Sequence, residues 1–143
     1  MANTMKYLNS ARAAGDNIIT KRYAVTLTGS YTAGGAIGVA GEVLNFTTPS
    51  NAGYAARTKL VSPPAAKLAA NTDFTVICPG GFTGQIEQNA TLPTAANFIL
   101  RLFGGGSGNA APAELTTATY ASQAPALAAS PVVVEVKVLQ KAN

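Results

Sequence analysis

The sequence predicts a single all-β domain, a β-sandwich or jelly-roll-like fold, preceded by an extended N-terminal arm. Three observations predict this fold. Apolar and polar residues alternate in several short segments, glycine and proline separate those segments, and helical periodicity is weak throughout. The chain has 143 residues, 48% of them hydrophobic, which is enough for one buried core. We expect the arm at residues 1–20 and the β domain at residues 21–143.

The expected arm has a weak helical pattern. Met5, Leu8 and Arg12 are spaced for one or two helical turns, and Gly15-Asp16-Asn17 would end them. A helix this short is marginal in water. We therefore expect residues 1–20 to pack on another chain rather than on their own domain.

The pattern changes to strict alternation at Lys21. Tyr23, Val25 and Leu27 are apolar in every second position, which predicts a half-buried strand ending at Gly29. Two further segments in the first half of the chain are expected to be extended. They are Val43–Phe46 and a short strand at Arg57–Val61, which Pro63-Pro64 would close.

Two clear strands are predicted in the middle of the chain. Thr72–Cys78 alternates, with Phe74, Val76 and Cys78 on one side, and a turn at Pro79-Gly80-Gly81 follows it. Asn97–Phe103 alternates too, with Phe98, Leu100 and Leu102 on one face. Between them, the more polar segment Gln85–Leu92 predicts an edge strand, and residues 104–109 predict a mobile glycine loop.

The last third of the chain contains the strongest strand signal. Valine occupies positions 132, 134, 136 and 138, while Glu135 and Lys137 lie on the opposite face, so Val132–Leu139 is predicted as a strand with one buried side. Before it, Leu115–Tyr120 predicts a Thr-rich strand. Pro125–Pro131 predicts a loop or a short helical turn.

The residue inventory argues against an enzyme. The chain has no histidine, so a Ser-His-Asp triad, a Cys-His pair and an imidazole-ligated metal are excluded. Cys78 is the single cysteine and lies in an apolar strand pattern without a cationic neighbour, which predicts a core residue. The glycines at 34–38 and 104–108 match neither a dinucleotide fingerprint nor a P-loop. We expect no catalytic residues, no metal site and no cofactor.

The six acidic residues are scattered singly along the chain. No spacing brings two of them together on one strand face, and no clustered oxygen ligands for a metal ion occur. We therefore expect surface carboxylates rather than a glycosidase pair. The six are Asp16, Glu42, Asp73, Glu87, Glu114 and Glu135.

Charge and hydropathy exclude two classes of partner. The net charge of +4 is concentrated in the first 22 residues, where single spaced cations predict a solvated segment rather than a nucleic-acid patch. The uncharged run at 23–41 is broken by threonine and glycine, so it predicts strand and turns rather than a membrane span. No apolar signal segment is present in residues 1–14. We expect no specific nucleic acid, no membrane contact and no secretion.

Only 11% of the residues are charged, against roughly 25% in an average soluble domain. Few ions then need desolvating when another subunit approaches. We favour a surface made for protein contacts over a merely neutral one.

Segments at both ends of the predicted domain resemble small bacteriophage virion proteins. Residues 23–35, the block 113–120 and the closing strand 132–139 are similar in style and order to head proteins, and most similar to capsid decoration, or cement, proteins. The resemblance covers about residues 20–140. It implies a β-rich protein, made in the host cytoplasm, that binds the exterior of the assembled capsid.

The implied partners are the major capsid protein and further copies of the chain in a symmetric homo-oligomer, with a trimer favoured over a dimer. Such a protein braces neighbouring capsomers by weak contacts repeated by symmetry. The alternative is another virion component, such as a tail, head-fibre or receptor-binding β module. Receptor-binding loops usually carry aromatic or charged residues, whereas the loops here contain Gly, Ala and Pro, which favours the shell.

Overall fold

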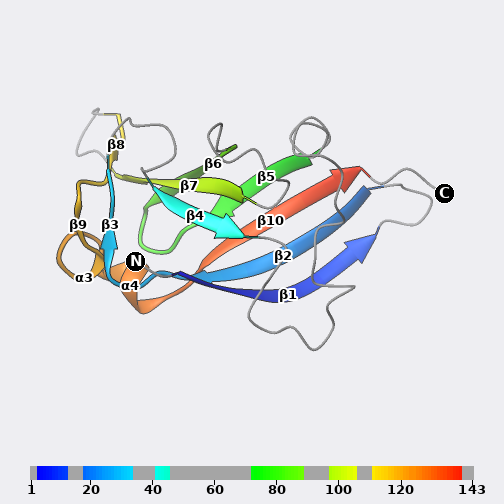
Figure 1. Ribbon diagram of the computed structural model, residues 1–143, viewed down its shortest axis with the longest axis horizontal. Helices are drawn as coiled ribbons and strands as arrows, with labels where there is room; N and C mark the ends of the chain where they lie inside the picture. Colours follow the sequence, from blue (N-terminus) through cyan, green and yellow to red (C-terminus); the bar gives the residue numbers. More distant parts are fainter. Residues whose placement is uncertain are drawn as a thin grey trace.

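The computed structural model describes residues 3–12, 18–33, 41–45, 72–88, 97–105 and 111–139. These residues form antiparallel sheets with two short helices, so the all-β prediction is confirmed (Figure 1). The jelly-roll-like sandwich stays a prediction. The elements are β1 Thr4–Arg12, β2 Ile18–Thr26, β3 Ser30–Tyr31, β4 Glu42–Asn45, β5 Thr72–Ile77, β6 Thr83–Gln88, β7 Asn97–Gly104, β8 Ala113–Glu114, β9 Ala118–Thr119, α3 Tyr120–Gln123, α4 Pro125–Ala129 and β10 Val132–Leu139.

Two sheets share the core. The first sheet has the strand order β1-β2-β10-β5, and the second has the order β4-β7-β6, with β8 paired to β7. Phe74 of the first sheet and Phe98 of the second pack with ring centroids 4.9 Å apart. The sheets therefore enclose one apolar cluster to which both contribute.

The predicted alternation is confirmed in β2, β7 and β10. Tyr23, Val25 and Leu27 are buried, as are Phe98, Leu100 and Leu102 and the valines at 132, 134 and 136. Ile99 is buried as well, although its position predicted the opposite face. Each of these strands thus presents its apolar side to the core.

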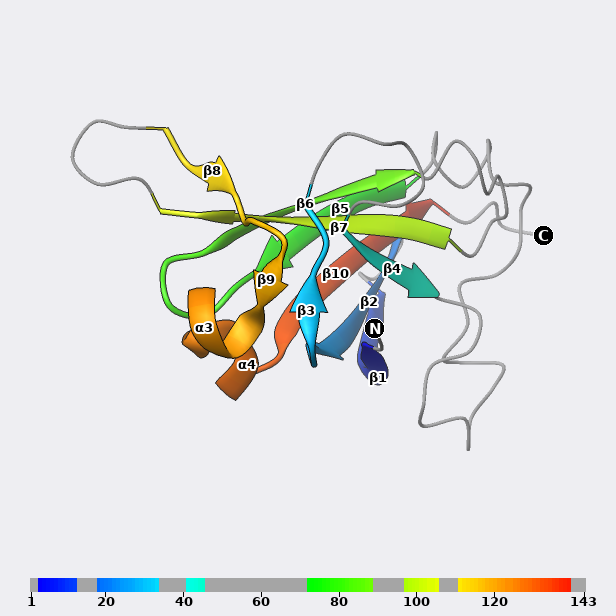
Figure 2. The ribbon, with the colours of Figure 1, turned by 60° about the vertical axis from the view of Figure 1, so that its left-hand side comes forward.

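One end of the sheets is closed by the β3-β9 pair and the two short helices (Figure 2). Tyr31, Tyr120 and Leu127 are buried there. Pro125 begins α4, where its missing N–H is not needed. The Pro125–Pro131 segment thus contains the short helical turn, one of its two predicted forms.

The arm prediction is wrong for the described residues. Thr4–Arg12 is strand β1, which pairs antiparallel with β2, and β2 itself begins at Ile18 rather than Lys21. Met5 is 5% exposed in the core. A β-bulge between Tyr7 and Asn9 inserts one residue, which breaks the period of two and leaves the helix-like spacing that the sequence displays.

The Leu115–Tyr120 strand prediction is wrong in part. Ala118–Thr119 is strand β9, but Tyr120 begins α3, and the strand before Leu115 is β8. The backbone N–H of Leu115 bonds to the carbonyl of Leu102. Residues 115 and 116 belong to no strand and the chain bends at Thr117, so the predicted strand is interrupted.

The remaining predictions for elements divide in two. Strand β5 and the turn at Gly80-Gly81 lie where the sequence predicts them. Strand β4 begins one residue before its prediction and β6 two residues before, and β6 ends the strand order of its sheet. The predicted strand at 57–61, the glycines at 34–38, most of the loop at 104–109 and residues 89–92 lie outside the described residues. In the described part, no helix is long and apolar enough to cross a membrane.

Candidate functional site

Three of the acidic residues lie in two groups, a buried clasp and a partly exposed ion-pair network. The buried clasp is centred on Glu42, the first residue of β4, which is only 1% exposed. Glu42 accepts a hydrogen bond from the Tyr120 hydroxyl and another from the Asn3 side-chain amide at 2.8 Å. Asn3 also bonds to the carbonyl of Val43 at 3.0 Å. The clasp ties the start of β1, β4 and α3 together.

The local sequence explains why this acid is inside. Residues 42 and 44 of β4 face the same way, and Leu44 is fully buried, so the alternation that buries the leucine also buries Glu42. Gly41 enters the strand with φ of +85°, and a Cβ there would lie 2.6 Å from Ile99. Only glycine fits this approach without movement. The prediction that all six acids lie at the surface is therefore wrong for Glu42.

Burial raises the pKa of the Glu42 carboxyl, while the hydrogen bonds from Tyr120 and Asn3 oppose that rise. The pKa of Tyr120 is raised as well, first by burial and then by its bond to Glu42. A phenol that donates to a buried carboxylate holds its proton over the physiological range. The Glu42–Tyr120 pair is therefore suited to joining β4 to α3.

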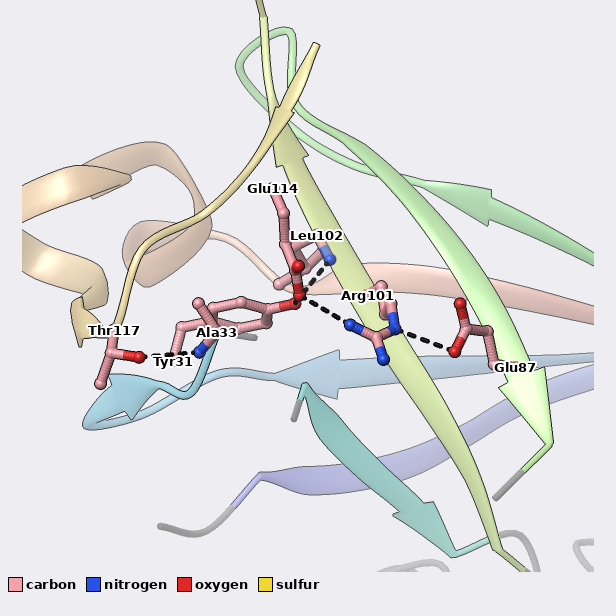
Figure 3. A network of polar contacts seen from close by, with 7 residues as sticks. All are labelled: Tyr31, Ala33, Glu87, Arg101, Leu102, Glu114 and Thr117. Carbon is pink, nitrogen blue, oxygen red and sulfur yellow. Dashed lines mark hydrogen bonds and ion pairs between the residues drawn. The ribbon is translucent and has the colours of Figure 1, made fainter. Parts of the chain in front are cut away.

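The ion-pair network is centred on Arg101 of β7 (Figure 3). The Arg101 guanidinium bonds to Glu87 at 2.9 Å and to Glu114 at 3.0 Å. The Tyr31 hydroxyl donates to the same Glu114 oxygen at 2.8 Å and accepts the N–H of Leu102. Strands β3, β6, β7 and β8 are thereby connected.

The electrostatics of this network follow from its pairing. The hydrogen bond with Glu87 is the largest cause of the raised pKa of Arg101. Burial raises the pKa of the Tyr31 phenol, and the N–H of Leu102 opposes that rise. Because the cation lies between the two carboxylates, neither of them is placed as an acid and base pair across an open space.

The clasp and the network are adjacent through two aromatic rings. Tyr31 and Tyr120 pack edge to face, with centroids 6.2 Å apart. Alongside them, the N–H of Ala33 bonds to the Thr117 hydroxyl at 2.9 Å (Figure 3). Sequence spacing did not reveal this grouping because its acids are far apart along the chain. The one sequence feature that indicates burial of Glu42 is its place two positions before the apolar Leu44, which puts both on the same face of a strand.

The other predicted residues are placed as follows. Cys78 is half-buried against the core, and burial raises the pKa of its thiol to about 11. Lys21 is buried, with its pKa lowered by burial, so the basic segment is not wholly solvated as predicted. Asp73 is exposed, Glu135 pairs with Arg22, and Asp16 lies outside the described residues. The described residues contain no group of three or more potential metal ligands among His, Cys, Asp and Glu.

Comparison with known proteins finds no matching family model, no matching curated protein and no matching solved structure.

Proposed function

We propose that this chain is a non-enzymatic capsid decoration protein. It binds the outer surface of an assembled phage head and stabilises the contacts between capsomers. Its partners are the major capsid protein and further copies of itself. The proposal takes its virus-specific part from the resemblance of residues 23–35, 113–120 and 132–139 to head proteins.

The observation that carries the non-enzymatic part is the engagement of the acidic side chains. Glu42 bonds to Tyr120 and Asn3, and Arg101 bonds to both Glu87 and Glu114. These groups join strands that are distant in sequence. Such cross-links suit a rigid domain that withstands mechanical load, and catalysis would require an acid or base free to exchange protons with a substrate.

The low charge supports the binding part. With 11% charged residues, the chain has few ions to desolvate when it is covered by a shell protein. The contacts of a single copy can then be weak, because the symmetry of a shell repeats them.

Cryo-electron microscopy of particles that contain this chain tests the proposal. We expect density for an all-β domain at symmetry-related positions on the outside of the head. Heads from a phage deleted for this chain should still assemble but should release their DNA at a lower temperature. Density on the tail or on a fibre would instead support the alternative virion component, and absence from purified particles would overturn both.

A paired set of variants tests the non-enzymatic part. Asp73→Asn changes an exposed acid and Glu87→Gln removes one carboxylate of the Arg101 network, and both variants should still fold and bind particles. A replacement that left both intact but abolished phage function would contradict the proposal.

A further inference from the structure

The outer face of the first sheet is the side of β1, β2, β10 and β5 that points away from the core. Register places Asn9, Arg22, Glu135 and Thr75 in one row across its middle. Arg22, Glu135 and Thr75 alternate along their strands with residues that face the core, and Asn9 pairs with Arg22. The four residues therefore share the outer face. Asn9, Arg22 and Thr75 are exposed, while the Glu135 side chain is 16% exposed beside Arg22.

Apolar side chains lie exposed at both edges of this face. Leu8, the extra residue of the β-bulge in β1, is 44% exposed, and Ile77 at the end of β5 is 52% exposed. Val133 and Ala24 lie between these edges and are half-buried. Ile77, Val133 and Ala24 lie in one row, so the apolar surface runs across β5, β10 and β2, and a contiguous apolar patch is typical of an interaction surface.

The charge pattern of the face is asymmetric about its centre. Arg22 of β2 and Glu135 of β10 form an ion pair of 2.6 Å in the middle row. The pair therefore places a positive charge on the β1-β2 half of the face and a negative charge on the β10-β5 half.

We propose that a second copy of this chain packs on this face about a two-fold axis parallel to the strands. That rotation reverses the strand order, so β1 lies over β5 of the second copy and β2 lies over β10. Arg22 then faces Glu135 of the second copy, and the reciprocal pair forms by symmetry. Val133 then meets Ala24 of the second copy, and Ile77 lies over its Lys6.

The remaining charges of the face are compatible with this arrangement. Lys6, Lys137 and Asp73 face Ile77, Thr20 and Ala11 of the second copy, so no like charges meet. A two-fold axis perpendicular to the strands would instead place Arg22 over Arg22 and Glu135 over Glu135, which is repulsive. The charge pattern thus selects one orientation. The charge pattern also favours a dimer over the trimer that the resemblance to cement proteins implies. Each subunit of a three-fold ring contacts its neighbours through two different patches, whereas a two-fold dimer uses one patch that pairs with itself.

The area of the face sets the expected strength. Four strands about 4.8 Å apart and three rows of side chains give a footprint of about 400 Å² per copy. Standard interfaces bury roughly 800 Å² per partner. We therefore expect a reversible dimer that dissociates on dilution.

Sedimentation velocity of Arg22→Glu and Glu135→Arg, alone and mixed, tests this orientation. Each variant carries two like charges at the centre of its face, so each should be monomeric, with a dimer Kd weakened by at least about tenfold. In an equimolar mixture the acidic face of one variant meets the basic face of the other. A heterodimer should therefore form, and only a contact between chains produces this result.

Two further variants act as controls for folding and location. Ile77→Lys changes an exposed residue of the face and should abolish the dimer while the circular dichroism spectrum stays native. Val43→Lys changes a comparably exposed apolar residue, 41% exposed on β4 of the second sheet, and should leave the dimer intact. The proposal is overturned by a wild-type monomer at up to about 1 mM, by a trimer, by dimeric single variants, or by a mixture that stays monomeric. The proposal that the chain binds the major capsid protein does not depend on this outcome.

Discussion

The two faces of the first sheet differ in how far they are buried, although the same strands form both. On the inner face, Tyr23, Val134 and Val136 are fully buried and meet the second sheet. On the outer face, Val133 is half-buried and Ile77 is more than half exposed. Alternation along one strand thus separates residues that hold the domain together from residues that are available to another chain.

Breaking the inner face should have the largest effect. Val134→Asp would place a charge at a position that is 0% exposed, between Tyr23 of β2 and Val76 of β5. We expect a loss of more than about 4 kcal/mol in the free energy of unfolding, measured by denaturant titration. The control Val134→Thr, which keeps the shape, should lose about 1–3 kcal/mol. A native-like midpoint for Val134→Asp would contradict the inner-face assignment.

Adjacent residues of β1 give the next largest contrast. Met5 is in the core and Lys6 is exposed on the outer face. Met5→Ala should destabilise the protein by about 2–3 kcal/mol, whereas Lys6→Ala should stay within about 0.5 kcal/mol. If both variants lost little stability in thermal unfolding, β1 would not contribute to the core and would be a dispensable arm.

A smaller and pH-dependent effect is expected at Glu42. Its pKa is raised by burial, so the folded protein binds a proton at a pH where the unfolded chain has released it. The stability from this group is therefore present at low pH and is lost as the pH rises through the raised pKa. The melting temperature of the wild type relative to Glu42→Gln should increase as the pH falls from about 7 to about 5.

The matched control for this experiment is Glu87→Gln. Glu87 is exposed and lies outside the clasp, so Glu87→Gln controls for the removal of one acid elsewhere in the protein. If Glu42→Gln showed the same pH dependence as the wild type, the buried carboxyl would not be the group that titrates.

The sequence predicted those parts of the fold that depend on alternation alone. Val132–Leu139 is the clearest case, because every second residue from 132 to 136 is a buried valine, and a helix would not produce a period of two. Strand β1 was missed because the bulge at Tyr7–Asn9 adds a residue and so hides the period of two. Tyr120 was assigned to a strand because its burial comes from the closed end of the sheets, which local pattern does not show.

The polar groupings could be predicted much less well than the strands. Arg101 meets Glu87 and Glu114 only because β6 and β8 both pair with β7. Glu42 meets Tyr120 across 78 positions of sequence. Such contacts are set by the topology of the sheets, and charge spacing along the chain carries no information about them.

The central claim is that the inner face of β10 folds the domain while its outer face associates with a second copy. Val133→Asp tests it most directly, with thermal unfolding and sedimentation velocity measured on the same sample. We expect a stability loss below about 1 kcal/mol, because Val133 lies on the outer face of the sheet, together with loss of the dimer, because Val133 would meet Ala24 of the second copy. Unfolding as severe as that of Val134→Asp, or a dimer that persists, would contradict the claim.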